Sequence, residues 1–396
     1  MRRLCTLLGM PQHRFASIHV VGTNGKTSVA RMTMALLEAH GVRAGAYVSP
    51  HISSWRERIL IGGEPISEEA FAAGVERAEE AAVVADRSAG EEGPVTQFEL
   101  DTAAAFIAFA EARVQWAVIE AGLGGRLDAT NVIPSKITVL TSVGLDHTEW
   151  LGETLEEIAG EKLAVLRDHT TLIAGPLTRE VEPVVEEAVE KRHAKVLRPT
   201  IVANNMIPGY QGTNFALAEA ATREALGTLD PEAEVAFVKG LSSRRFSIPG
   251  RAQLLAGDPP VVYDAAHNPD GAKALADSLP EMAGDSAVVC CIAILAEKDA
   301  RGIIEPLAEV CSGFVCTQIP EDVIRGSGRP VGESYSAAEL ADTCRELDVE
   351  AEAVQEPLKA WVRTRALARE KGGVALAAGS HYLLSCIWTE RHDPSS

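Results

Sequence analysis

The sequence predicts two α/β domains in succession: a doubly wound, mainly parallel sheet that carries a phosphate-binding loop (P-loop), and a smaller, Rossmann-like α/β domain. Strand-like apolar segments alternate with helix-like segments almost to the end of the chain, which is typical of parallel sheets covered by helices. A glycine-containing turn at residues 22–28 joins the first strand to the first helix. A basic segment with a proline, residues 244–250, separates two series of such elements.

The first series indicates a domain over residues 1–243. Short β-branched and apolar runs predict strands, and longer segments with apolar residues every three or four positions predict helices. We expect strands at 18–21, 45–48, 116–120, 137–142 and 171–174. We expect helices at 27–40, 68–85, 98–113, 154–167 and 179–192.

The second series indicates a smaller domain over residues 251–396. Expected strands lie at 261–264, 287–292, 313–316 and 374–377. Expected helices lie at 271–278, 337–346, 357–370 and 381–391. We interpret residues 244–250 as a linker where a hinge would sit.

Composition limits the possible classes of function. The 396 residues are 46% apolar and 23% charged, as in an ordinary soluble protein. A net charge of −19 argues against non-specific binding to nucleic acid or to an anionic membrane surface. No apolar run approaches the roughly 20 residues that span a membrane, and the seven cysteines show no CxxC pair. We expect a cytoplasmic protein with reduced thiols that binds small molecules.

The stretch from Gly22 to Ser28, GTNGKTS, has the composition of a phosphate cradle. Its two glycines let the backbone approach an anion, the following helix N-terminus adds partial positive charge, and Lys26 adds a full one. The hydroxyl of Thr27 or Ser28 suits a Mg²⁺ ligand. The match is shorter than the full P-loop pattern, whose first glycine would fall at Val20. The alternative is an ordinary strand–helix turn with a solvated lysine.

Polar side chains follow three other strands of the first series. Ser49 follows the strand at 45–48, Glu120 ends the strand at 116–120, and His147 lies just after the strand at 137–142. In a doubly wound sheet such strand ends meet beside the P-loop, where hydroxyl, carboxylate and imidazole groups can hold Mg²⁺. Taken singly, each residue is also explained by turn chemistry, a cap or a hydrogen bond.

The second series has a similar group after its first strand, in the sequence YDAAHNPDGA. Asp264, His267 and Asn268 lie between an apolar strand and a helix. We expect Asn268 to cap that helix with a proline directly after it. Arg251 is either a residue that reaches a phosphate or an exposed linker arginine.

Several motifs in one order resemble the folylpolyglutamate synthase and dihydrofolate synthase family, within the wider Mur ligase group. They are GTNGKTS, SPH with RERI, TQFE, IEAGLGGRLDATN, LDHTEWLGETLEEIAGEK, YQGTN, IPGR and YDAAHNPDGA. The resemblance implies an ATP-dependent amide ligase. In that family a substrate carboxylate is phosphorylated to an acyl phosphate, and the amino group of L-glutamate then displaces phosphate.

The resemblance also implies roles for individual residues. It assigns nucleotide contacts to Gly22, Thr23, Asn24, Gly25, Lys26, Thr27, Ser28, Asn214, Arg251 and Asp264. It assigns the ligation of two Mg²⁺ ions to Ser49, Glu120, His147 and Lys162, the last as a lysine carboxylated by CO₂. Lys26, Lys162 and His267 would be catalytic, with His267 near the reacting phosphate. A lysine must lose its proton before it takes up CO₂, so Lys162 would need a lowered pKa; its spacing alone indicates a solvated helix lysine.

The corresponding pterin-binding region comprises Thr96, Gln97 and Phe98, with Arg56 and Arg58 nearby. Core packing at a helix start is the alternative for Phe98. The acceptor that the resemblance implies is dihydropteroate, a folate that already carries glutamate, or both. Polyglutamate length stays open, and we expect a monomer.

Two alternatives remain beside the folate ligase. One is a P-loop nucleotide-binding regulatory protein without ligase activity, which would bind ATP without glutamate-dependent phosphate release. The other is a Mur-type ligase with another carboxylate acceptor. Because the P-loop begins at residue 22, we do not expect the UDP-sugar domain that a peptidoglycan ligase places ahead of it.

Overall fold

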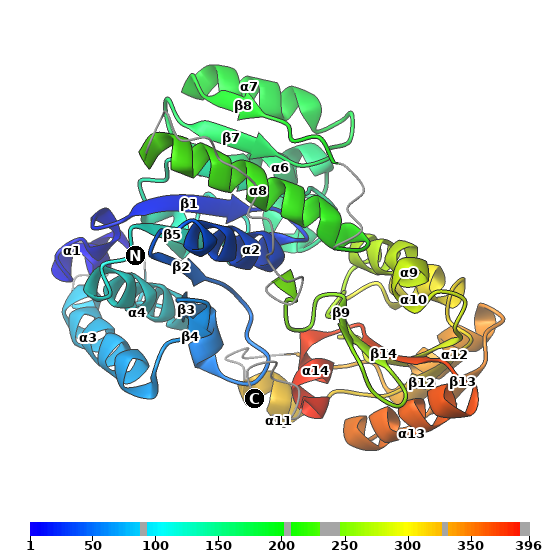
Figure 1. Ribbon diagram of the computed structural model, residues 1–396. Helices are drawn as coiled ribbons and strands as arrows, with labels where there is room; N and C mark the ends of the chain where they lie inside the picture. Colours follow the sequence, from blue (N-terminus) through cyan, green and yellow to red (C-terminus); the bar gives the residue numbers. More distant parts are fainter. Residues whose placement is uncertain (88–92, 202–206, 230–245, 327–331, 389–396) are drawn as a thin grey trace. The chain divides into compact units, whose positions relative to one another are not determined.

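The computed structural model describes residues 1–87, 93–201, 207–229, 246–326 and 332–388 (Figure 1). These form two compact units. The first holds the described residues up to 201 together with 212–229 and Phe246, and the second holds 207–211 and 247–388. Residues 244 and 245 of the predicted linker and 389–391 of the last predicted helix lie outside the described residues.

The first unit is built on an eight-stranded sheet in the order β4-β3-β2-β5-β1-β6-β7-β8. The six neighbouring strands β2-β5-β1-β6-β7-β8 pair in parallel. At one edge of the sheet, β3 pairs antiparallel with β2, and β4 pairs antiparallel with β3. The strands are β1 (Ala16–Val21), β2 (Ala44–Tyr47), β3 (Ile59–Ile61), β4 (Glu64–Pro65), β5 (Trp116–Glu120), β6 (Ile137–Leu140), β7 (Thr171–Ala174) and β8 (Lys195–Leu197).

The strand order places four strand ends side by side at one edge of this sheet. β1 lies between β5 and β6, and β2 pairs with the far side of β5. Because all four strands are parallel, the chain leaves each of them at the same edge, which is where ligands bind in doubly wound sheets. The fully buried residues of β2, β5 and β6 explain why these strands read as continuous apolar runs.

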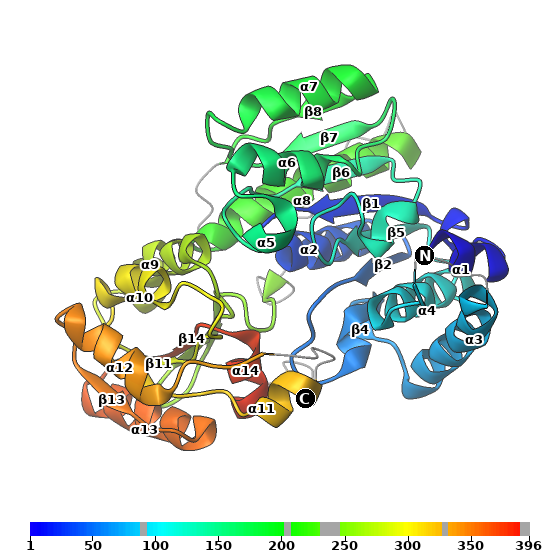
Figure 2. The same ribbon diagram turned by 180° about the vertical axis from the view of Figure 1, so that it is seen from behind.

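Helices cover both faces of this sheet. Figures 1 and 2 show α2 and α8 over one face and α6 over the other. Phe106 and Phe109 of α4 pack against Tyr47 and Ile119 of the sheet. The helices are α1 (Arg2–Leu7), α2 (Lys26–Ala39), α3 (Glu68–Asp86), α4 (Gln97–Glu111), α5 (Thr148–Leu151), α6 (Leu155–Leu163), α7 (Glu182–Arg192) and α8 (Tyr210–Leu229), with 3₁₀ turns η1 (Pro11–His13), η2 (Trp55–Arg58) and η4 (Ala129–Val132).

The second unit has a six-stranded sheet in the order β13-β12-β11-β14-β10-β9, parallel except for β9 at one edge. The strands are β9 (Gln253–Leu255), β10 (Val261–Tyr263), β11 (Val288–Ile292), β12 (Gly313–Cys316), β13 (Ala351–Ala353) and β14 (Val374–Ala378). The helices are α9 (Pro269–Ala283), α10 (Ala300–Ala308), α11 (Glu321–Gly326), α12 (Ala337–Glu346), α13 (Pro357–Glu370) and α14 (His381–Ile387).

A large core cluster of the second unit lies between its sheet and one layer of helices. Leu275 of α9, Ile304 of α10 and Leu340 of α12 share one buried cluster with Ile292 and Leu376 of the strands. Figure 1 shows α13 on the opposite side of this sheet from α9 and α10. Every cysteine of the chain is a free thiol, and six of the seven are buried.

The predicted fold class is confirmed, and each predicted strand overlaps a strand of the structure. The differences have local causes. The strand predicted to reach Ser142 ends at Leu140, because residues 141–144 bond to the P-loop instead. Helices α1, α5, α8, α10 and α11 were not predicted, and α10 contains Pro306, a residue that disfavours a helix interior. Within the described residues, no helix is both long and apolar enough to cross a membrane.

Candidate active site

The P-loop follows β1 and comes very close to its neighbours. Gly22 has a φ of 152°, and a Cβ there would lie 1.9 Å from Thr141 Oγ1. Gly25 has a φ of 87°, and a Cβ there would lie 2.4 Å from Oδ1 of Asn214 on α8. Both positions therefore require glycine. Asn214, a predicted nucleotide contact, lies directly against the loop.

The backbone of the P-loop is anchored to the segment that follows β6. The Thr23 N–H donates to the Ser142 carbonyl at 2.9 Å, and the Asn24 N–H donates to Ser142 Oγ at 2.9 Å. The Thr23 hydroxyl donates to the Gly144 carbonyl at 3.1 Å and accepts from the Gly144 N–H at 3.0 Å. The segment that leads to His147 thus holds the loop by backbone and side chain together.

Two lysine amines converge on one carbonyl of this loop. Lys26 Nζ donates to the carbonyls of Gly22 at 3.0 Å and Thr23 at 3.1 Å, and Lys162 Nζ donates to the Gly22 carbonyl at 3.1 Å. Lys162 is only 3% exposed, so the interpretation of a solvated helix lysine is wrong. Burial, and then the nearby charge of Lys26, lower the pKa of Lys162 to about 7, while Asp146 opposes the shift. An appreciable fraction of this amine is therefore neutral near pH 7.

Glu120 lies at the centre of the strand ends and is 2% exposed. The Thr27 hydroxyl is 3.1 and 3.0 Å from its two carboxylate oxygens, and the Ser49 N–H donates to Oε2 at 3.0 Å. The predicted convergence of the strand ends of β2 and β5 with the P-loop is thus present. A buried carboxylate beside a hydroxyl is a donor set that suits a hard cation such as Mg²⁺.

His147 lies at the start of α5 with a φ of 51°. Its N–H donates to Asp146 Oδ1 at 2.9 Å, and its Nε2 lies 3.8 Å from the same oxygen. In the part of the chain that the structure describes, no three His, Cys, Asp or Glu side chains form a group that could hold a metal by themselves. The predicted ligands instead combine a hydroxyl and a modified lysine with Glu120 and His147, so the metal site stays a prediction.

Arg58 occupies a buried polar cluster near the strand end of β2. Its Nη1 lies 3.0 Å from Asp101 Oδ2, its Nε donates to His51 Nδ1 at 3.0 Å, and its guanidinium lies 4.2 Å from the ring centre of Trp55. Tyr47 donates to the same carboxylate at 2.9 Å. Burial and the charge of Arg58 lower the pKa of His51 to about 4. Two polar side chains and one aromatic ring therefore hold the Arg58 guanidinium.

Arg56 is less enclosed than Arg58. Its Nη1 donates to the Ile66 carbonyl at 3.1 Å, and its Nη2 lies 3.7 Å from a carboxylate oxygen of Glu68, whose side chain is 81% exposed. An ion pair so close to solvent contributes little to stability. The Arg56 guanidinium can therefore leave this pair at small cost.

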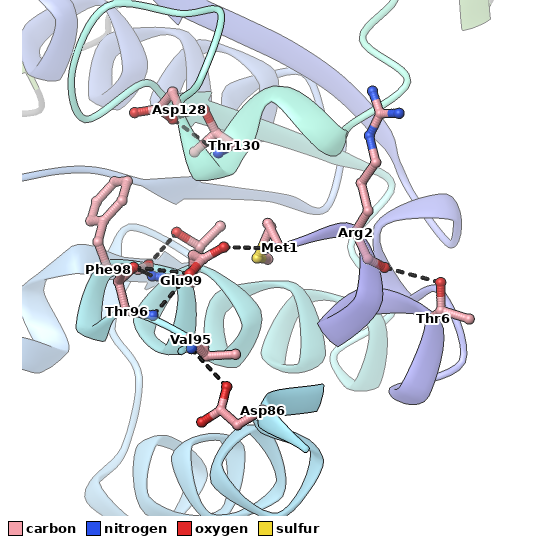
Figure 3. A network of polar contacts seen from close by, with 11 residues as sticks. Met1, Arg2, Thr6, Asp86, Val95, Thr96, Phe98, Glu99, Asp128 and Thr130 are labelled. Carbon is pink, nitrogen blue, oxygen red and sulfur yellow. Dashed lines mark hydrogen bonds and ion pairs between the residues drawn. The ribbon is translucent and has the colours of Figure 1, made fainter. Parts of the chain in front are cut away.

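The predicted pterin-binding region lies at the start of α4. Thr96 caps the helix: its Oγ1 accepts from the Glu99 N–H at 3.2 Å, and its N–H donates to the Glu99 carboxylate at 2.8 Å. Gln97 is the first helical residue. The ring of Phe98 extends toward the loop that carries Asp128 (Figure 3), and its centre lies 6.1 Å from that of Tyr47. Phe98 is partly buried against the core, so core packing explains part of its position.

The strand-end group of the second unit is centred on Asp264, which is 2% exposed. Its Oδ2 accepts from the Tyr210 hydroxyl at 2.5 Å and from the Ala252 N–H at 2.7 Å, and its Oδ1 accepts from the Ala266 N–H at 2.7 Å. Burial raises the pKa of Asp264, although Tyr210 and Arg251 oppose the shift. The carboxylate ties the turn after Gly250 to the segment that follows β10.

The neighbours of Asp264 are held by their own backbone. His267 Nδ1 lies 2.9 Å from the Ala265 carbonyl, and Arg251 Nη1 donates to the Gly250 carbonyl at 3.0 Å. Asn268 caps α9 by accepting from the Gly271 N–H at 2.8 Å, with Pro269 at the first helical position, so the predicted cap is confirmed.

Family models match both parts of the chain. The Mur ligase middle domain matches residues 20–218, and the Mur ligase glutamate ligase domain matches residues 250–381. The chain is 36% identical to a dihydrofolate synthase/folylpolyglutamate synthase of Mycobacterium tuberculosis over 79% of this chain and 72% of that protein. It is 32% identical to the Bacillus subtilis protein of the same name over 78% of each chain. The chain belongs to the folylpolyglutamate synthase and dihydrofolate synthase family.

Solved structures of this family share the fold. A Mycobacterium tuberculosis folylpolyglutamate synthase complexed with ADP and AMPPCP matches with a TM-score of 0.83 and 30% identity, covering 97% of this chain and 93% of that one. The Escherichia coli FolC protein in complex with DHPP and ADP matches with a TM-score of 0.80 and 26% identity, over 97% and 91%. A bifunctional synthase with Mn, AMPPNP and L-glutamate matches with a TM-score of 0.78 and 25% identity, over 97% and 92%.

Sequence reasoning missed several groups that position the family's motif residues in this chain. Ser142 anchors the P-loop, Asp101 pairs with Arg58, and Tyr210 bonds Asp264. Ser142 is the last residue of the strand predicted at 137–142, so the strand-end argument that found His147 could have found it. Asp101 and Tyr210 lie on helices, where spacing gives no sign of the bond they make.

Proposed function

We propose that this chain is an ATP-dependent ligase that joins the amino group of L-glutamate to a carboxylate of a folate or pteroate. The convergence of the Lys26 and Lys162 amines on the P-loop, beside the buried carboxylate of Glu120 and its partner Thr27, is the observation that carries the proposal. The Lys26 ammonium, the backbone N–H groups of the loop and the N-terminus of the helix that follows it favour an anionic ligand here. The ADP- and AMPPCP-bound relative supports ATP as that ligand.

The reaction has two steps. An oxygen of the acceptor carboxylate attacks the terminal phosphorus of ATP, the bond to ADP breaks, and an acyl phosphate forms. The amino nitrogen of glutamate then attacks the acyl carbon, phosphate leaves with the former carboxylate oxygen, and the nitrogen loses a proton. The chain aligns the anions and neutralises moving charge through Lys26 and the amides of the loop from Gly22 to Ser28.

We propose that Ser49, Glu120 and His147 hold a divalent cation at the strand ends. The fit rests on the Thr27 hydroxyl and the Ser49 backbone, which already point at the Glu120 carboxylate. When bound, the cation neutralises phosphate charge. The relative described with Mn, AMPPNP and L-glutamate supports a divalent metal and glutamate as ligands.

We propose that Lys162 is carboxylated by CO₂ and provides a ligand for a second Mg²⁺. The neutral amine nitrogen attacks the carbon of CO₂ and releases a proton, which leaves a carboxylate on the side chain. A pKa of about 7 makes the neutral amine available, which supports the proposal. ¹³C NMR with ¹³CO₂ would test it, since Lys162→Met should lack a signal that the wild-type protein shows.

For the acceptor, we propose that Thr96, Gln97 and Phe98 bind the pterin ring, with Arg56 close to the substrate. Arg58 instead supports this region through Asp101 and His51, because those contacts already use its guanidinium. The DHPP-bound Escherichia coli relative supports an acceptor of the pteroate class.

In the second unit, we propose that Arg251 and Asp264 contact the nucleotide and that His267 acts near the reacting phosphate. Asp264 would act mainly by holding the turn at Arg251, given the three donors on its carboxylate. The free thiols fit a reducing compartment, and we propose a cytoplasmic monomer.

Phosphate release with ATP, Mg²⁺ and L-glutamate tests the function, with dihydropteroate and tetrahydrofolate offered separately. We expect release only when glutamate and at least one acceptor are present, and Lys26→Ala should abolish it. If neither acceptor stimulates phosphate release, the assignment of a folate or pteroate acceptor is wrong. Nucleotide binding without that stimulation would favour the regulatory protein, and stimulation by another carboxylate would favour a different Mur-type ligase.

A further inference from the structure

A buried chain of hydrogen bonds begins on the strand that carries the P-loop. His19 lies on β1, three residues before Gly22, and is fully buried. Its Nε2 lies 2.8 Å from Oγ1 of Thr130, which is also fully buried, and the Thr130 hydroxyl donates to Asp128 Oδ1. We call these three residues the His19 relay. Figure 3 shows its Asp128–Thr130 end beside the start of α4.

The direction of these bonds follows from the single proton on the Thr130 hydroxyl. That proton goes to the carboxylate, so the hydroxyl oxygen accepts from His19 Nε2–H. Burial and the charge of Arg167 lower the pKa of His19 to about 3, which keeps the ring neutral with one N–H. His19 Nδ1 is buried and has no hydrogen-bond partner among the described residues.

The far end of the relay holds the glycine-rich loop after β5. Asp128 Oδ2 accepts from the Leu123 N–H at 2.9 Å. Gly122 lies against the ring of Phe98, so closely that a Cβ at Gly122 would be 2.4 Å from Phe98 Cζ. The relay therefore fixes the backbone on which the Phe98 ring rests.

A purely structural role explains this arrangement poorly. An aliphatic residue on β1 would pack in the same core without burying an imidazole whose Nδ1 has no partner among the described residues, and each such group costs about 1–3 kcal/mol. The neighbours on β1, Ile18 and Val20, are aliphatic and fully buried. The cost at His19 is understandable if the position of the loop matters for function.

Building on the proposed function, we propose that His19 is a positioning residue for the acceptor. Through Thr130 and Asp128 it holds Leu123, and with it the adjacent Gly122, against Phe98, and this shapes the surface that receives the pterin ring. The bonds of the relay lead to the loop at 122–128 rather than to the P-loop, so the effect should fall on the acceptor and not on ATP.

Two pairs of matched variants test the relay. Thr130→Val removes the hydroxyl at nearly constant volume, and Thr130→Ser keeps it. His19→Leu removes the N–H, and His19→Gln offers an amide N–H in its place. We expect Thr130→Val and His19→Leu to raise the KM for the acceptor about tenfold, with the KM for ATP within about twofold of wild type. Thr130→Ser and His19→Gln should restore most of the acceptor affinity.

Three results would overturn the proposal: an equal rise of both KM values, an unchanged acceptor KM in Thr130→Val, or a Thr130→Ser enzyme as impaired as Thr130→Val. Should His19→Leu fail to fold, the threonine pair decides.

Amide hydrogen exchange gives a second reading that does not depend on activity. The Leu123 amide should exchange at least tenfold faster in Thr130→Val than in Thr130→Ser, while the amides of β1 stay protected. Equal exchange in the two variants would refute the relay. If the wild-type protein releases no phosphate with glutamate and acceptor, the proposed function fails, and the exchange experiment still decides whether His19 positions the loop.

Discussion

The two strand-end carboxylates, Glu120 and Asp264, invite comparison because each lies at the end of a buried strand and each is 2% exposed. Glu120 faces the Thr27 hydroxyl and the Ser49 backbone, beside the loop that binds the Lys26 and Lys162 amines. Asp264 is held by one tyrosine hydroxyl and two backbone N–H groups.

The difference shows that the same sequence signal can mark a ligand site or an internal support. In the sequence both carboxylates look alike, since each stands directly after a run of apolar strand residues. Around Glu120 the partners include a hydroxyl that can turn toward a cation, and positive charge lies close by on the P-loop. Around Asp264 the partners join two stretches of backbone. The catalytic rate should therefore depend more on Glu120, and the free energy of unfolding more on Asp264.

The largest expected effect is the loss of Lys162. Lys162→Ala should lower kcat/KM by about 10²–10³-fold, since it removes a buried charged or carboxylated group from the site. Far-UV circular dichroism should be unchanged. Lys136→Ala, which changes an exposed lysine of the same unit, serves as the control and should stay within about twofold of wild type. Near-normal activity of Lys162→Ala would remove Lys162 from the catalytic site.

The two carboxylates can be tested against each other with amide substitutions. Glu120→Gln should lower kcat/KM by about 10²-fold with little change in the free energy of unfolding. Asp264→Asn should lower the free energy of unfolding by about 2–3 kcal/mol, because its amide group faces N–H and O–H donors. Urea unfolding and steady-state kinetics measure both variants. A loss of stability in Glu120→Gln together with a loss of activity alone in Asp264→Asn would contradict the roles assigned to the two carboxylates.

The pH dependence of stability tests the burial of Lys162. Its pKa is about 7 in the folded state against 10.5 unfolded, so between pH 7 and 9 the unfolded state binds more protons. The contribution of Lys162 to the free energy of unfolding therefore rises with pH, by about 2 kcal/mol between pH 7 and pH 9. Urea unfolding of the wild type, measured relative to Lys162→Met at both pH values, should show this rise. A constant difference would mean that Lys162 titrates like a solvated lysine.

The smallest expected effect concerns the hydroxyl that bonds Asp264. Tyr210→Phe should lower the free energy of unfolding by about 1–2 kcal/mol, because a donor to a buried carboxylate is lost. Tyr335→Phe is the control: its hydroxyl makes a long contact of 3.4 Å to the Lys298 carbonyl and should matter much less. In the background of Asp264→Asn, the effect of Tyr210→Phe should shrink. Additive effects would show that the two groups do not act together.

The fold and the P-loop could be predicted from sequence because they depend on periodicity and on local chemistry. Apolar strands, helix spacing and GTNGKTS are visible in one dimension, and strand order then follows general rules for parallel sheets. This reasoning also found Glu120 and Ser49, since the ends of parallel strands meet at one edge.

The remaining features depend on contacts between distant segments. The sequence indicates a solvated lysine at 162, because the spacing of residues in its helix gives no sign that the amine bonds to the Gly22 carbonyl of the P-loop. Arg58 looked available for substrate, but its partner Asp101 lies 43 positions away on a helix. His19 looked like one residue of a β-strand, and only the structure joins it to Thr130, 111 positions away.

Transfer of oxygen from the acceptor to phosphate tests the central claim most directly. The acceptor is prepared with ¹⁸O in its carboxylate and incubated with the protein, ATP, Mg²⁺ and L-glutamate, and the released phosphate is analysed by mass spectrometry. Ligation through an acyl phosphate predicts one ¹⁸O atom in each phosphate and a product longer by one glutamate. Phosphate without ¹⁸O would contradict the account.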